Sequence, residues 1–87
     1  MVYTIEFAPR AEKDFKKLDR PIQKQLRIKI DALVKNPRPH GVEKLAGEDG
    51  LYRIRSGDYR VIYQIQDKVL VVLLVKIGHR REIYQKK

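Results

Sequence analysis

The segment YRIRSGDYRVIY, residues 52–63, constrains the fold more than any other part of this sequence. Residues of alternating character lie on both sides of Ser56-Gly57, which is the pattern of a β-hairpin with a two-residue turn. The glycine tolerates the positive φ that such a turn needs. The segment therefore predicts two adjacent antiparallel strands at the heart of the fold.

A turn at Ser56-Gly57 pairs Arg55 with Asp58. Two residues further from the turn, Arg53 then faces Arg60. Because side chains alternate along a strand, this register gathers the three arginines on one face and the apolar residues on the other. A slip of one residue would mix the two sets, so the pattern itself selects the faces. The predicted core face consists of Tyr52, Ile54, Tyr59, Val61 and Tyr63.

The arginine face is an unusual choice for stability alone. Like charges opposite one another destabilise a sheet by up to about 1 kcal/mol, and threonine or opposite charges would be the more common solution. Two interpretations follow. The arginines are solvated side chains lying over the sheet, or they form an anion-binding face, because a planar guanidinium matches phosphate oxygens in pairs.

The rest of the chain predicts helices and further strands around this hairpin. Residues 2–7 alternate as a half-buried strand. Apolar residues then recur at helical spacing in two segments, one beginning near Pro9 and one capped by Asp19 and ending before Asn36-Pro37. The segment 36–50, rich in glycine and proline, predicts a loop.

Three strands follow, over residues 51–55, 59–66 and 68–77. The last contains VLVVLLV, which indicates a central strand covered on both faces. The order β-α-α-β-β-β predicts an α+β fold in which a two-helix hairpin packs on a mostly antiparallel, roughly four-stranded sheet. We expect residues 1–87 to form a single domain.

A formal net charge of +9 on 87 residues favours phosphate-rich or acidic partners. The chain has no cysteine, which is consistent with a reducing cytoplasm and leaves no thiol nucleophile. No signal peptide is recognisable, and the longest apolar run is too short to span a bilayer. We therefore expect a soluble cytoplasmic protein with no membrane partner.

The segment GHRREIYQKK after the last strand adds further basic and aromatic side chains. If the last strand pairs antiparallel with the second hairpin strand, one end of the last strand lies near Arg60. Arginines beside aromatic rings suit RNA, whose bases stack on rings while guanidiniums hold phosphates. The predicted RNA-binding residues are Arg53, Arg55, Arg60, Arg80 and Arg81.

These residues could support cleavage of RNA by its own 2′-hydroxyl, which requires a base, an acid and cations that stabilise the transition state. Arginine stays protonated and is a poor base. Histidine is the residue type that most often carries protons at neutral pH, which makes His79 a candidate, and Tyr84 could serve because nearby positive charge lowers the pKa of a tyrosine. The candidate catalytic residues are Arg53, Arg55, Arg60, His79, Arg80 and Tyr84, with Glu43, Glu48 and Asp58 as weaker carboxylate candidates.

A metal site or cofactor site is not indicated by the sequence. The two histidines, His40 and His79, lie far apart, and no paired-acid spacing accompanies them. No phosphate-binding glycine loop precedes a helix. We expect neither a metal nor a cofactor.

The element order, the run EKLAGEDGLYRIRSGDYRVIYQI and the ending KIGHRREIY resemble the RelE toxins of the RelE/ParE superfamily over essentially the whole chain. The resemblance implies a type II toxin that enters the ribosomal A site and cleaves messenger RNA. It implies a RelB-like antitoxin as partner, and contact with operator DNA only through the antitoxin complex. By position, Arg53, Arg55, Arg60, Arg80 and Tyr84 match the family's functional residues.

Two departures from the family pattern bear on mechanism. Well-studied RelE toxins carry lysine where this chain has Arg53 and Arg55, so these positions are expected to stabilise charge rather than accept a proton. The spacing from Arg80 to Tyr84 is also shorter, which makes His79 a stronger candidate for proton transfer. The alternatives left open are a ParE-like inhibitor of DNA gyrase without nuclease activity, and a non-catalytic basic module that binds an antitoxin or nucleic acid.

Overall fold

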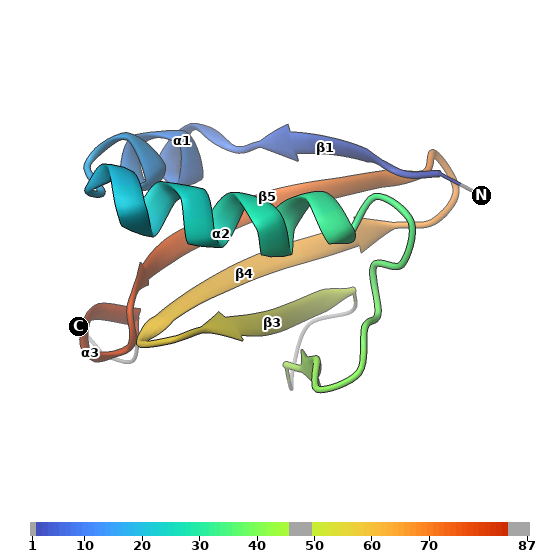
Figure 1. Cartoon of the computed structure of the whole chain (residues 1–87). Coiled ribbons are helices and arrows are strands. Elements are labelled where there is room, and N and C mark those ends of the chain that lie inside the picture. The colour runs from blue at the N-terminus through green and yellow to red at the C-terminus, as the bar shows by residue number, and fades with distance from the viewer. Residues whose placement is uncertain (1, 46–49, 84–87) are drawn as a thin grey trace.

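The chain folds into one five-stranded sheet with two main helices packed against it (Figure 1). The computed structural model describes residues 2–45 and 50–83. The elements are β1 (Thr4–Phe7), α1 (Pro9–Lys16), α2 (Arg20–Ala32), β2 (Glu43–Lys44), β3 (Leu51–Ser56), β4 (Tyr59–Gln66), β5 (Val71–His79) and α3 (Arg80–Ile83). The predicted α+β class is confirmed, with β2 and α3 as additions.

The strands lie in the order β1-β5-β4-β3-β2, and all neighbours are antiparallel except β1 and β5. The strand β5 has a neighbour on each side, as its apolar sequence predicts. Its Val72 and Leu74 are fully buried, whereas Val71 and Leu73 on the other face are half-buried. The prediction that both faces of this strand are covered is therefore only partly correct.

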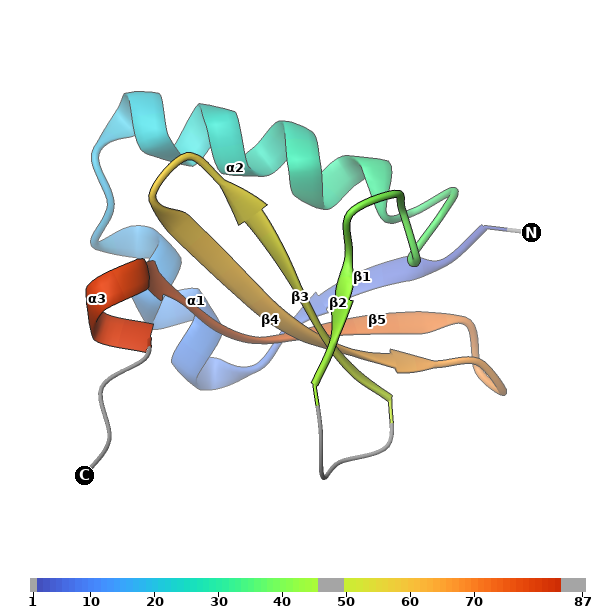
Figure 2. The same ribbon diagram turned by 90° about the horizontal axis from the view of Figure 1, so that it is seen from below.

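Figure 2 shows that the helix α2 lies across one face of the sheet. Its apolar residues repeat at helical spacing, so Leu26 and Ile30 reach the sheet together, followed by Leu33. Asp19 occupies the N-cap position with extended backbone, but its side chain makes no capping hydrogen bond, contrary to the prediction. The buried core consists of Tyr3, Ala11, Leu26, Ile30, Leu33, Tyr52, Ile54, Val61, Tyr63, Ile65, Val72, Leu74 and Ile77.

The helix α1 continues along β5 where β1 ends. The amide of Ala8 donates to the carbonyl oxygen of Leu74 at 2.8 Å. Further along, the amide of Ile77 donates to Oδ2 of Asp14 at 3.0 Å. A side chain on α1 thus satisfies a β5 amide that a longer β1 would otherwise bind.

The β3–β4 hairpin forms as predicted, but its turn lies one residue later in the chain. Ser56 pairs with Tyr59, so the turn residues are Gly57 and Asp58 rather than Ser56 and Gly57. Gly57 has φ +61°, and the only non-glycine residue with positive φ in the described ranges is Leu70. A turn with positive φ at its first residue alone is type II′, which requires glycine first. This preference excludes Ser56 as the first turn residue.

The corrected register pairs Arg55 with Arg60 and Arg53 with Ile62, in place of the predicted pairs. Moving a two-residue turn by one position changes the pairing between the strands by two residues. Because side chains alternate with a period of two, each side chain keeps its face. The arginines therefore share one face as predicted, and the like-charge pair is Arg55 with Arg60.

Two other boundaries differ from the prediction. The strand β5 begins at Val71 rather than Lys68 because Asp67 to Leu70 form the turn after β4, with Leu70 at φ +56°. The segment 36–50 contains the short strand β2, which extends the sheet beyond β3. In the described part of the chain, no helix is both long and apolar enough to cross a membrane.

A polar cluster fixes the loop after α2. Oδ1 of Asp67 accepts the Tyr3 hydroxyl at 2.6 Å, and its Oδ2 accepts Nη2 of Arg38 at 2.9 Å. Arg38 also donates to the Tyr52 hydroxyl at 3.2 Å and lies over that ring. This clamp joins the start of β1, the loop after α2 and the β4–β5 turn.

Candidate functional site

The hairpin places the three arginines on the sheet face opposite the core residues of β3 and β4. Arg60 also pairs with Gly78 of β5, so the end of β5 lies beside the arginines. We call Arg53, Arg55 and Arg60 the arginine face. The expectation that the end of the last strand approaches Arg60 is confirmed.

Arg60 is buried, with 6% of its surface exposed. Its Nη1 donates to the carbonyl oxygens of Gly57 and Tyr59, both at 3.1 Å. Its Nε is buried and has no hydrogen-bond partner. Because a buried donor without an acceptor is costly, this arginine is held in the turn at some expense to stability.

Arg53 binds the carboxylate of Glu43 on β2. Its Nε donates to Oε1 of Glu43 at 2.8 Å, and its Nη2 donates to the same oxygen. The hydrogen bond from Arg53 lowers the pKa of Glu43, and the charges of Arg55 and Arg60 lower it further. Glu43 therefore stays ionised next to the arginine face, as a counter-ion rather than a proton donor.

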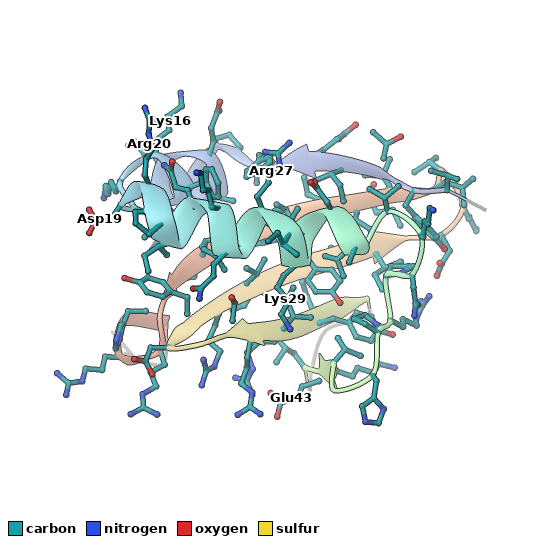
Figure 3. The ribbon with its side chains drawn as sticks, viewed as in Figure 1. Lys16, Asp19, Arg20, Arg27, Lys29 and Glu43 are labelled. Carbon is teal, nitrogen blue, oxygen red and sulfur yellow. The ribbon has the colours of Figure 1, made fainter. Side chains whose placement is uncertain are left out.

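Arg55 is the exposed member of the arginine face. No hydrogen bond or ion pair involves it within the described residues. It borders a cavity of about 380 Å³ between α2 and β3 that Lys29 and His40 also line. Figure 3 shows Lys29 projecting from α2 on the side of β3 and Glu43, whereas Arg27 projects from the opposite side of the helix (Figure 3).

His79 ends β5 and lies directly opposite Tyr59. The two rings meet edge to face, with centroids 5.4 Å apart. Nδ1 of His79 accepts the amide of Arg81 at 3.2 Å. A neutral ring that accepts this bond carries its hydrogen on Nε2, so His79 can donate a hydrogen bond there. The ring lies on the face of the sheet opposite the arginine face, because Tyr59 and Arg60 alternate along β4.

The short helix α3 carries Arg80 and Arg81, both exposed. The amide of Arg80 donates to the carbonyl oxygen of Asp58 at 2.7 Å, which fastens α3 to the hairpin turn. The structure thus brings these two arginines to the same end of the sheet as Arg60. The candidates Tyr84 and Glu48 lie outside the described residues.

Two further titratable side chains are exposed. Asp58 is exposed in the hairpin turn, and His40 is exposed in the loop after α2. Within residues 2–45 and 50–83, no three histidine or carboxylate side chains gather closely enough to hold a metal ion. Chemically, the arginine face offers guanidinium groups for an oxyanion, and His79 offers a hydrogen-bond donor on the opposite face of the sheet.

Sequence reasoning missed the contribution of Tyr59, which it assigned only to the core. Its contact with His79 depends on how β4 pairs with β5, and that pairing shifts at a bulge between Ile62 and Tyr63. Nothing in the sequence marks the bulge. The pairing of Glu43 with Arg53 was also missed, because β2 is too short to show a pattern.

The chain is similar to known proteins over most of its length. A family model described as the ParE toxin of the type II toxin–antitoxin system, parDE, matches residues 5–84. The mRNA interferase toxin RelE of Escherichia coli K12 is 35% identical, over 97% of this chain and 92% of that protein.

Two solved structures have a similar fold. The toxin chain in the intact E. coli RelBE toxin–antitoxin complex aligns with a TM-score of 0.79 at 34% identity, covering 88% of this chain and 95% of that one. The archaeal RelE–RelB complex of Pyrococcus horikoshii OT3 aligns with a TM-score of 0.80 at 32% identity, covering 92% and 97% respectively.

Proposed function

Because the chain belongs to the RelE family of the RelE/ParE toxin superfamily, we propose that it is the toxin of a type II toxin–antitoxin system that cleaves messenger RNA in the ribosomal A site. The observation that carries this proposal is the arginine face with α3 beside it, on a chain 35% identical to a protein named as an mRNA interferase. A gathering of guanidiniums at one end of a sheet suits a phosphate in reaction.

The reaction we propose is attack by a ribose 2′-hydroxyl on the adjacent phosphate. The new bond forms a cyclic phosphate, and the bond to the 5′-oxygen of the next nucleotide breaks. Arg55 and Arg80 bind the phosphate oxygens, whose charge grows in the transition state. Arg60 holds the turn that places Arg55, so its role is partly positioning. These cations supply the stabilisation without a metal ion.

Proton transfer completes the step. The 2′-hydroxyl loses a proton to a base, and the leaving 5′-oxygen gains one from an acid. His79 is the candidate acid from the sequence, and it can act as one only as an imidazolium, after its Nδ1 releases the Arg81 amide. Its ring faces away from Arg60, so reaching the phosphate also requires the ring to leave Tyr59. Tyr84 remains the candidate base on the strength of its position in the sequence. Replacing His79 with alanine should slow cleavage about 100-fold, and an undiminished rate would remove it as the acid.

The proposed partner is an acidic antitoxin of the RelB type. The RelE proteins of E. coli and P. horikoshii are solved in complexes with RelB, and the net charge of +9 favours an acidic segment here. The ribosome and messenger RNA are the proposed targets. Contact with operator DNA is proposed only through the antitoxin complex.

A second candidate function is inhibition of DNA gyrase, since the matching family model is described as a ParE toxin. That activity does not use cleavage chemistry, so it leaves messenger RNA whole and blocks supercoiling. The gathering of Arg55, Arg60 and Arg80 at one end of the sheet favours the nuclease.

The deciding experiment is primer extension on a reporter message in a purified translation system, with and without ribosomes. We expect cuts that require ribosomes and that Arg55→Gln reduces by about 100-fold. Arg55 is exposed, so this variant should keep the fold. The matched control is Arg27→Gln. This variant also removes one arginine charge, but from the side of α2 that faces away from Lys29 and β3, and it should cleave normally. An intact message with wild-type protein would reject the nuclease, and a gyrase supercoiling assay would follow.

A further inference from the structure

A second polar cavity lies at the same end of the sheet as α3. It encloses about 470 Å³ between α1, the residues after α1 and the ends of β4 and β5. Tyr59 and His79 line it from the sheet. Both belong to the side-chain set that faces away from Arg60, so the cavity and the arginine face lie on opposite faces of the sheet. Its lining residues are Arg10, Asp14, Lys17, Leu18, Tyr59, Ile77, Gly78 and His79.

The single carboxylate of this lining is already occupied. Oδ2 of Asp14 accepts the amide of Ile77, and its Oδ1 accepts Nε of Arg10 at 3.2 Å. Only 12% of the Asp14 side chain is exposed. Asp14 therefore orients Arg10 at the rim of the cavity, and it offsets only one of the basic groups that surround it.

The other polar groups of the lining are available. Within the described residues, the Lys17 ammonium and the Tyr59 hydroxyl make no hydrogen bond. His79 uses Nδ1 for the Arg81 amide, which leaves Nε2 as its donor. The cavity is thus lined by donors from two separate parts of the chain, with a net positive charge. An anion with several oxygens fits these donors better than a neutral or cationic ligand does.

We propose that this cavity binds a phosphate group of an RNA backbone, separate from the phosphate that the arginine face takes. The proposal rests on the proposed function for its choice of RNA. The hairpin turn and α3 lie between the two sites, and α3 contributes exposed Arg80 and Arg81 along the way. Basic groups therefore continue around the end of the sheet, as a groove that follows an RNA strand requires.

The bound phosphate belongs either to the message beside the cleavage site or to ribosomal RNA. We would test Lys17→Gln, and Tyr59→Phe as a second variant that removes only a hydroxyl. The first probe is a short fluorescein-labelled single-stranded RNA, whose binding to the whole chain is followed by fluorescence anisotropy over a range of potassium chloride concentrations. The second measurement is cosedimentation of the protein with ribosomes.

If the phosphate comes from the message, Lys17→Gln should weaken binding of the short RNA about tenfold, as for one charge-assisted hydrogen bond. The slope of log affinity against log salt should fall in magnitude by about 0.7. If it comes from ribosomal RNA, the short RNA should bind normally and ribosome cosedimentation should weaken instead. Tyr59→Phe should weaken the same interaction as Lys17→Gln and leave the salt slope unchanged.

The matched control is Lys24→Gln, which removes the same charge from an exposed position on α2. If Lys17→Gln behaves like Lys24→Gln in both assays, the cavity binds no phosphate and the proposal is overturned. The cleavage assay separates this outcome from failure of the proposed function. Normal cleavage with no effect at Lys17 rejects only the cavity. A wild-type protein that binds RNA through Lys17 but cuts no message rejects only the nuclease.

Discussion

Arg60 combines two properties that rarely coincide, a full positive charge and burial. In the described part of the chain it is the only buried charged side chain. Its guanidinium binds two carbonyl oxygens of its own turn, and Nε finds no acceptor. A side chain chosen for stability alone would be apolar here. We interpret Arg60 as a residue kept for the site it supports.

We predict that Arg60→Ala lowers the free energy of unfolding by about 1–3 kcal/mol, because the carbonyl groups of Gly57 and Tyr59 lose their donor. Urea unfolding followed by circular dichroism measures this. Arg55→Ala, on the same face but exposed, is the control and should change stability by less than about 0.5 kcal/mol. Equal effects would mean that burial does not distinguish the two arginines.

At the level of single residues, the sequence predicted well which face of the sheet each hairpin side chain occupies, and predicted poorly how exposed it is. Alternation places Arg53, Arg55 and Arg60 on one face for either position of a two-residue turn, because the pairing then changes by two residues. It does not show that Arg60 folds back on the turn or that Arg53 binds Glu43. Those contacts depend on side-chain rotamers and on the short strand β2, and no local sequence pattern indicates either.

Among the elements, the β3–β4 turn is the one whose geometry decides the site. Gly57 has φ +61° and no atom within 4 Å of an added Cβ, so a substitution meets backbone strain rather than a clash. Because L-residues disfavour this conformation, we predict that Gly57→Ala costs about 1 kcal/mol of stability. The measurement is again urea unfolding.

The control for the turn is Asp58→Ala, at the neighbouring exposed position without positive φ. It should leave stability within about 0.5 kcal/mol of wild type. A larger loss at Asp58 than at Gly57 would contradict the type II′ assignment. The sequence contained this information, since a Gly-Asp pair suits such a turn better than a Ser-Gly pair does.

The clamp between β1, the loop after α2 and the β4–β5 turn predicts a pH dependence. The hydrogen bond from Arg38, followed by that from Tyr3, lowers the pKa of Asp67 below its ordinary value. A carboxyl group with a lowered folded-state pKa stabilises the fold above its unfolded pKa of about 3.9. That stabilisation is lost as the pH falls through the lower, folded-state value.

Asp67→Asn should therefore be less stable than wild type at neutral pH, and its thermal midpoint should fall less as the solution is acidified below about pH 4. Thermal denaturation over a pH series measures both effects. Asp31→Asn is the control, because Asp31 forms only an exposed helical ion pair with Arg27. Parallel curves for wild type and Asp67→Asn would show that the clamp adds nothing.

For the whole molecule, charge is strongly unbalanced. The chain has 20 lysines and arginines against 11 aspartates and glutamates. The ion pairs of the described residues join Arg10–Asp14, Lys16–Glu12, Arg27–Asp31, Arg38–Asp67 and Arg53–Glu43. Even complete pairing would leave a surplus of positive groups that repel one another in the folded state.

We predict that the melting temperature rises with ionic strength, because salt screens this repulsion. Phosphate should raise it further than chloride at equal ionic strength, since phosphate also binds guanidiniums. Differential scanning fluorimetry in the two salts measures the effect. A melting temperature that falls with potassium chloride would mean that attractive ion pairs outweigh the repulsion.

The overall architecture was largely predictable because periodicity reports which side of each element is buried. The apolar run around Val72 identified a strand with a neighbour on each side, and the spacing of Leu26 and Ile30 identified a helix that packs against the sheet. The bulge near Ile62 and the way α1 replaces β1 along β5 were not predictable. Both arise from contacts between residues distant in sequence.

The parallel pairing of β1 with β5 has a consequence for how the protein is made. Residues 4–7 find their sheet partner only in residues 71–74, within the described chain. During synthesis the first strand therefore stays unpaired while both helices and the whole hairpin emerge from the ribosome. Pairing over so long a stretch of chain slows folding. The nascent polypeptide thus completes its sheet, and with it any toxic surface, only near the end of the domain's synthesis.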